Sequence, residues 1–148
     1  MEKVGVVTVT YNSEDVFHAF LLDVVSQRHT NFILYVIDNA SNDSTLEILS
    51  RFKDIRIKLI KNTSNKGVAA ANNQGVKEAI KDNCSQILLL NNDIEFSESL
   101  FDDLLLEQKQ KQCSIVVPKI MYFDNQNVIW YAGGSFNKNR GYIPSHRG

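Results

Sequence analysis

The sequence predicts an α/β fold, a three-layer α/β/α sandwich with a mostly parallel central sheet. Short runs rich in β-branched residues alternate along the chain with longer stretches whose apolar residues recur at helical spacing. Such alternation is typical of a parallel sheet covered by helices, because each right-handed crossover returns the chain through a helix. At 148 residues, the chain has the length of a single domain of this kind.

The first elements are predicted from their burial pattern and capping. The run VGVVTVT at residues 4–10 is largely apolar and β-branched, which indicates a strand buried on both faces. Helical spacing follows over residues 13–27, with Ser13 in position to act as the N-cap. The run FILYVIDN then indicates a second buried strand that ends at Asp38.

The middle of the chain contributes a helix, a strand and another helix. A short helix is predicted within residues 41–52, capped by Asp43 or Ser44. Residues 55–62 alternate apolar and basic side chains, which is typical of a half-exposed strand near the edge of a sheet. The stretch GVAAANNQGVKEAIKDN, at 67–83, has helical spacing.

The last predicted elements begin with QILLLNND at 86–93. We expect it to be a buried strand whose leucines form a rigid mount for the polar residues that follow. Residues 97–112 are predicted to be a helix with Ser97 as its cap. The run at 114–123 is predicted to be the last strand, with Pro118 marking a bend or bulge.

Polar residues follow each of the first four predicted strands. These segments read TYNSED, DNASNDS, NTSNKG and NNDIE. Ligands of parallel sheets bind outside the carboxyl ends of the strands. We therefore expect the four segments to build one binding site.

Two common phosphate-binding loops are absent from the sequence. The segment after the first strand, TYNSED, is no GxGxxG loop, and no GxxxxGK followed by Ser or Thr occurs in the chain. A response-regulator receiver resembles the chain in size, but places its phospho-acceptor aspartate where this chain reads KNTSN. A divalent metal held by a carboxylate would therefore be the means of neutralising a bound phosphate.

The composition excludes several classes of protein. A net charge of -1 and a pI near 6.3 argue against a dedicated nucleic-acid binder. Cys84 and Cys113 have no CxxC spacing, which indicates reduced thiols in a cytosolic protein. The N-terminus is no signal peptide, and no apolar run approaches the roughly 20 residues that span a bilayer. We expect a cytoplasmic protein with no transmembrane segment in this chain.

Four motifs together resemble a known family. VVTVTYN, VIDNASNDST, NKGVAAANNQG and LLLNNDIEF, in this order and spacing, resemble the N-terminal half of a family 2 glycosyltransferase of the GT-A fold. The tail IWYAGGSFNKNRGYIPSHRG resembles the bacterial rhamnosyltransferase-like branch. The resemblance implies inverting transfer of a sugar from a UDP- or dTDP-linked donor to a glycan or lipid-linked acceptor, with Mg²⁺ or Mn²⁺ as cofactor. It also implies polysaccharide biosynthesis for the cell envelope, with the full-length protein peripheral at the inner face of the membrane.

The resemblance also assigns roles to individual residues. Asp93 matches the last acid of the family's D-x-D signature, the metal ligand, and Asn91 stands in place of the first acid. Asp38 matches the acid that accepts the N3–H of uracil or thymine. The other positions implied to bind the donor nucleotide are Thr10, Tyr11, Asn12, Asn39, Asn65, Lys66, Gly67, Asn72 and Asn92. From the residues alone, Asp93 and Asp38 also fit turn or capping residues, and Lys66 fits a solvated lysine.

Finally, the resemblance implies a C-terminally truncated enzyme. The family's general base is expected beyond Gly148, so residues 1–148 would form one nucleotide-sugar-binding domain that lacks it. Residues 124–148 would then begin the acceptor-side region. The alternative is a non-catalytic α/β nucleotide-binding or regulatory module of similar layout.

Overall fold

The computed structural model of the chain describes residues 1–137 and 143–146. They form two compact units, Met1–Phe101 and Asp102–Gly148, and each unit is described here by itself. The single domain expected over 1–148, with an acceptor-side region from 124, stays a prediction.

The first unit is built on a four-stranded sheet with the strand order β3-β2-β1-β4. Its strands are β1 (Val4–Thr10), β2 (Phe32–Asp38), β3 (Ile57–Lys61) and β4 (Gln86–Leu89). All neighbouring strands in this sheet run parallel, as the sequence predicted. Thr10 pairs with Asp38 and Asp38 with Lys61, so three strands end at the same level.

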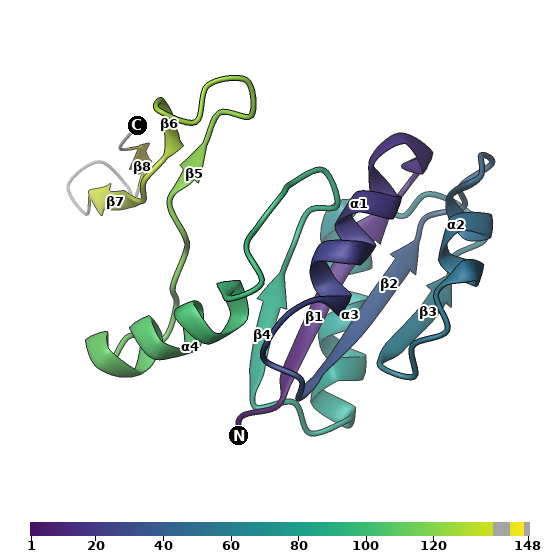
Figure 1. Ribbon diagram of the computed structural model, residues 1–148, viewed down its shortest axis with the longest axis horizontal. Coiled ribbons are helices and arrows are strands. Elements are labelled where there is room, and N and C mark those ends of the chain that lie inside the picture. The colour runs from purple at the N-terminus through teal and green to yellow at the C-terminus, as the bar shows by residue number, and fades with distance from the viewer. Residues whose placement is uncertain (138–142, 147–148) are drawn as a thin grey trace. The chain divides into compact units, whose positions relative to one another are not determined.

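Helices cover both faces of this sheet (Figure 1). Helices α1 (Glu14–Val25) and α2 (Thr45–Arg51) lie on one face, and α3 (Val68–Lys81) lies on the other. Ser13 and Ser44 occupy the two N-cap positions, but neither side chain makes a capping hydrogen bond. The three-layer arrangement predicted from the sequence is confirmed.

The core has one layer on each side of the sheet. On the α3 side, Val7, Tyr35 and Ile37 pack with Ala71 and Ala79 of the helix. Alternate residues of the same strands point to the opposite face. The buried residues of α1 on that side are Phe17, Phe20, Leu21 and Val24.

A glycine lets α3 approach the sheet closely. A Cβ atom added at Gly75 would lie 2.3 Å from Cγ1 of Val7, far inside a normal contact distance. The absence of a side chain at Gly75 is therefore what allows α3 to lie this close to β1.

The prediction of a buried fourth strand is wrong. Strand β4 is an edge strand of the described sheet, and the side chains of Ile87 and Leu89 are 37% and 53% exposed. Only Leu90, just beyond the strand, is buried among the residues of this leucine run. An apolar run in the sequence indicates that burying the strand is favourable. It does not indicate which faces of the strand the rest of the protein covers.

The end of the first unit and the start of the second differ from the sequence prediction. Helix α4 (Leu100–Lys111) begins three residues after the predicted cap, and the amide of Leu100 donates to the carbonyl of Ser97. Within the predicted strand at 114–123, only β5 (Ile120–Met121) forms. Pro118 has no amide hydrogen to donate to a ladder, which disfavours a longer strand.

Short antiparallel pairs complete the second unit. Strand β5 pairs with β6 (Ile129–Tyr131), and β7 (Gly134–Asn137) pairs with β8 (Ile143–His146). No helix in the described part of the chain is both long and apolar enough to cross a membrane.

Candidate functional site

A cavity of about 290 Å³ lies in the first unit where strands β1, β2 and β4 end. Its lining comes from the ends of β1 and β4, from the segments that follow all four strands, and from the start of α3. The lining residues are Val9, Tyr11, Ser13, Asn39, Asn65, Val68, Asn72, Leu89, Leu90, Asn91, Asn92 and Asp93.

The cavity brings together most of the predicted site residues. Those that line it are Tyr11, Asn39, Asn65, Asn72, Asn91, Asn92 and Asp93. Those that do not are Thr10, Asn12, Asp38, Lys66 and Gly67. Lining a cavity assigns no role, so the individual functions of all twelve stay predictions.

The side chain of Asp38 is buried and accepts hydrogen bonds from neighbouring residues. Asp38 is 1% exposed. The hydroxyl of Thr10 donates to Oδ1 at 3.0 Å, and the backbone amide of Ser41 donates to Oδ2 at 3.1 Å. These bonds fix the tip of β2 against the tip of β1. Reading of a nucleobase by Asp38 stays a prediction.

Asn12 joins the loops that follow β1 and β2. The backbone amide of Asn12 donates to Oγ of Ser41 at 3.0 Å. The side-chain Oδ1 of Asn12 accepts from the backbone amide of Asn42 at 2.8 Å. Asn12 and Ala40 both adopt positive φ angles, of 51° and 66°. Asparagine tolerates this conformation better than most residues, whereas alanine holds it at a cost. The two loops are therefore held in a defined shape by their mutual contacts.

Reciprocal capping reinforces the same link. Asp43 Oδ2 accepts from the amide of Glu14 at the start of α1, while Glu14 Oε2 accepts from the amide of Ser44. Asp43 Oδ1 also accepts from the amide of Thr45, and Thr45 Oγ1 accepts from the amide of Ser13. Desolvation raises the pKa of Asp43, but the hydrogen bonds from Thr45 and Glu14 outweigh it and hold the pKa below its ordinary value. Each helix start is thus capped by a side chain of the other.

A network of amide side chains supports the cavity at Asn39, which is 2% exposed. Asn39 Oδ1 accepts from Nδ2 of Asn62 at 2.9 Å and from the backbone amide of Lys66 at 3.5 Å. Asn62 and Gln74 exchange two further hydrogen bonds, of 2.9 and 3.0 Å. Sequence reasoning missed Asn62 and Gln74, because nothing in the local pattern shows that they meet.

Asn92 links the tip of β4 to the loop after β1. Its Nδ2 donates to the carbonyl of Val9 at 3.1 Å and to Oγ of Ser13 at 3.0 Å. Ser13, predicted only as a helix cap, therefore belongs to the cavity wall. Both amide hydrogens of Asn92 are therefore used inside the protein.

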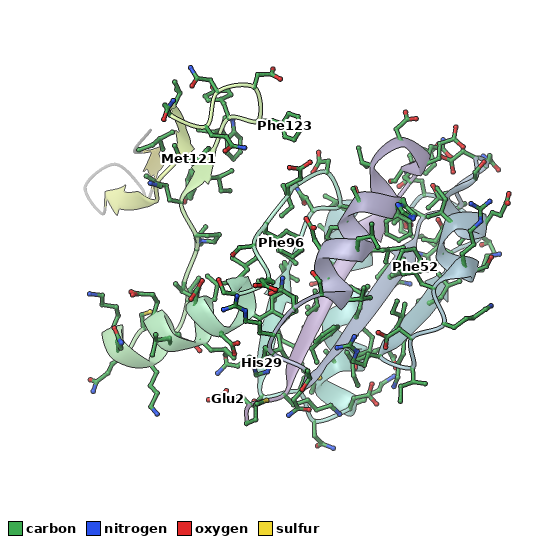
Figure 2. All side chains as sticks on the ribbon, viewed as in Figure 1. Glu2, His29, Phe52, Phe96, Met121 and Phe123 are labelled. Atoms are coloured by element: carbon green, nitrogen blue, oxygen red, sulfur yellow. The ribbon has the colours of Figure 1, made fainter. Side chains whose placement is uncertain are left out.

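The segment after Asp93 is fixed at its far end. The amide of Phe96 donates to Asp23, and the ring of Phe96 packs edge-on against Phe20 with centroids 6.1 Å apart. Figure 2 labels Phe96 on this segment. Gln27 then donates to the carbonyl of Ser97 at 2.7 Å. Residues 93–95 thus form a short loop anchored on both sides.

The oxygen-bearing side chains of the cavity fit a divalent cation that is held jointly by the protein and by a phosphate ligand. Among the described residues, no group of three or more His, Cys, Asp and Glu side chains is placed to hold a metal. Asp93 is the one carboxylate in the described lining, beside the amides of Asn91 and Asn92. Mg²⁺ is commonly held by one or two carboxylates together with substrate phosphates and water. Asp93 can therefore serve as the single protein carboxylate in such a metal site.

Comparison with known proteins gives a family match. The family model described as "Glycosyl transferase family 2" matches residues 5–146. Over 79 residues the chain is 37% identical to WfaP of Escherichia coli, named UDP-Glc:alpha-D-GlcNAc-diphosphoundecaprenol beta-1,3-glucosyltransferase. That match covers 53% of this chain and 32% of WfaP, so the chain spans about a third of the length of this relative.

Solved structures share the fold. A crystal structure of residues 1–349 of S. aureus TarS matches with a TM-score of 0.73 at 20% identity, over 90% of this chain and 41% of that one. A complex of the same TarS segment with UDP matches with a TM-score of 0.64 at 21% identity, over 82% and 39% of the two chains. None of these proteins is named a rhamnosyltransferase, so assignment to that branch stays a prediction.

Proposed function

The chain belongs to glycosyl transferase family 2 and has the GT-A fold, and from this premise we propose that its first unit binds a UDP- or dTDP-linked sugar donor. One observation carries the proposal: the cavity at the carboxyl ends of the parallel strands, in which Tyr11, Asn39 and Asp93 meet. Ligands of open α/β sheets bind at this edge. The donor named for WfaP, UDP-Glc, and the UDP bound in the TarS complex support the choice of nucleotide.

We assign the donor diphosphate to the Asp93 side of the cavity. Asp93 would hold Mg²⁺ or Mn²⁺, and Asn91 would donate a hydrogen bond to the ribose. A bound divalent ion would neutralise the diphosphate and stabilise it as a leaving group. Asp38 would accept the N3–H of uracil or thymine, which distinguishes these bases from cytosine.

The proposed positions of the remaining donor contacts follow the same edge of the sheet. Thr10, Tyr11 and Asn12 would lie along the base. The opening of α3 would face the nucleotide through Asn65, Lys66 and Gly67, because helix N-termini attract anions. Asn39, Asn72 and Asn92 complete the proposed donor-binding set.

The proposed reaction is inverting transfer to a glycan or lipid-linked hydroxyl. The acceptor oxygen bonds to the anomeric carbon, the bond to the nucleoside diphosphate breaks, and a general base takes the hydroxyl proton. The described cavity lining offers no carboxylate other than Asp93, which is assigned to the metal. This lining therefore supplies no candidate for the base. As the family resemblance implies, we propose that the base lies outside residues 1–148, in a cytoplasmic enzyme of cell-envelope polysaccharide synthesis.

Calorimetric titration with UDP tests the donor-binding proposal. We expect binding in Mn²⁺ or Mg²⁺ and none in EDTA. Asp93→Asn should weaken metal-dependent binding by at least about tenfold, a loss of roughly 1.4 kcal/mol. Glu47→Gln, an exposed acid on α2 that does not line the cavity, removes the same charge and should bind as the wild type does.

Wild-type protein that binds no UDP in either metal would overturn the proposal. Binding of equal strength in EDTA, with Asp93→Asn unaffected, would leave Asp93 as a turn residue and contradict its assignment to the metal.

A further inference from the structure

Ser13 has a hydrogen-bonding position that its role as a helix N-cap does not explain. It precedes α1, yet its hydroxyl makes no capping bond to that helix. Instead, Oγ accepts from the backbone amide of Tyr11 at 3.3 Å and from Nδ2 of Asn92 at 3.0 Å. Ser13 is half-buried and lines the cavity between these two residues.

These two hydrogen bonds occupy both acceptor positions of the Ser13 hydroxyl. A serine hydroxyl accepts two hydrogen bonds and donates one. With both acceptor positions occupied, its proton is what remains available. No acceptor for this proton is found among the residues that the structure describes, so the hydroxyl is free to donate a hydrogen bond at the cavity that Ser13 lines.

We propose that Ser13 is a donor-binding residue of this cavity, and that its hydroxyl donates a hydrogen bond to an oxygen of the bound nucleotide. The inference rests on the proposed function. A nucleoside diphosphate presents suitable acceptors on the base carbonyls, the ribose and the phosphates. The same hydroxyl is also a positioning group, because it connects the backbone of Tyr11 to the residue that precedes Asp93.

Binding of UDP and of uridine, measured by calorimetry in Mn²⁺, separates these roles. Ser13→Ala is expected to weaken UDP binding about tenfold, as for a lost hydrogen bond in a desolvated site. Ser13→Thr keeps the hydroxyl and should stay within about twofold of the wild type. Ser50→Ala, the same change at an exposed position of α2, should have no effect.

The uridine titration locates the acceptor. A loss with uridine equal to that with UDP places the acceptor on the base or ribose, and a loss with UDP alone places it on a phosphate. Both results support the contact.

Should Ser13→Ala lose its cooperative unfolding transition, Ser13→Cys takes its place, because a thiol is a weaker donor of similar size.

Two results would overturn the inference while the proposed function stands. The first is UDP binding by Ser13→Ala as tight as by the wild type. The second is a loss in Ser13→Thr as large as in Ser13→Ala. Failure of the wild type itself to bind UDP would instead remove the proposed function.

Discussion

At the scale of single residues, the cavity depends on polar groups that are already bound inside the protein. Asp38 and Asn39 are almost fully buried, and their oxygens accept hydrogen bonds from neighbouring loops. A buried polar group is tolerated when its hydrogen bonds are made. These side chains therefore hold the strand tips in place whether or not they also touch a ligand.

One buried residue departs from this rule. Thr8 of β1 is fully buried, and its hydroxyl has no hydrogen-bond partner among the described residues. Thr8→Val replaces the hydroxyl by a methyl group of similar shape, so we expect it to raise the free energy of unfolding by about 1 kcal/mol. Urea denaturation measures the change.

Thr10→Val is the matched control for that prediction, because the hydroxyl of Thr10 donates to Asp38 in the same strand. It should be destabilised by roughly 1–3 kcal/mol, since a buried carboxylate loses a donor. If Thr8→Val were destabilised as much as Thr10→Val, the Thr8 hydroxyl would have a partner after all.

At the scale of elements, the starts of α1 and α2 depend on each other through Asp43. Asp43→Ala is expected to lower the free energy of unfolding by about 1 kcal/mol at pH 7, the usual cost of a lost cap. Because the folded-state pKa of Asp43 lies below its ordinary value of 3.8, this stabilisation is complete above that value. It is lost as the pH falls through the lower folded-state pKa.

Denaturation of wild type and Asp43→Ala between pH 7 and pH 2 tests this dependence. The difference should be constant at neutral pH and shrink in acid. Asp124→Ala, at an exposed aspartate, should change stability little at any pH. A difference for Asp43→Ala that grows in acid would contradict the capping role.

The close contact between α3 and β1 leads to a second prediction, on the stability of a Gly75 variant. In Gly75→Ala the new methyl group would meet the buried side chain of Val7. Overpacking of this kind costs about 1–3 kcal/mol, whereas the helix propensity of alanine returns at most about 1. We expect net destabilisation in urea unfolding, with partial rescue when Val7→Ala is added. Stabilisation by Gly75→Ala alone would contradict the packing.

The elements also show which features the sequence could predict. Strands β1 and β2 match their predicted runs because both faces are covered, so most of their side chains are apolar. Residues 114–119 have a similar composition but form no strand, and the side chain of Ile115 is 80% exposed. The local composition of a segment indicates that its side chains favour burial. Whether the segment forms a strand depends on pairing with residues elsewhere in the chain.

At the scale of the molecule, the location of the site was predictable and its internal bonding was not. The polar strand tips identified the edge of the sheet, because parallel strands end together there. The bond between Ser13 and Asn92 joins residues 79 positions apart, and no local pattern specifies it. For the same reason, Ser13 was predicted only as a cap.

The central claim is that this cavity binds a uracil or thymine nucleoside diphosphate with a divalent metal. Thermal and denaturant unfolding with UDP, dTDP, CDP and GDP, each in Mn²⁺ and in EDTA, tests it most directly. At about 100 times their dissociation constants, UDP and dTDP should each add roughly 2.7 kcal/mol of stability in Mn²⁺. CDP and GDP at the same concentrations should add clearly less, and EDTA should remove every gain. Equal stabilisation by all four nucleotides, or stabilisation that persists in EDTA, would contradict the account.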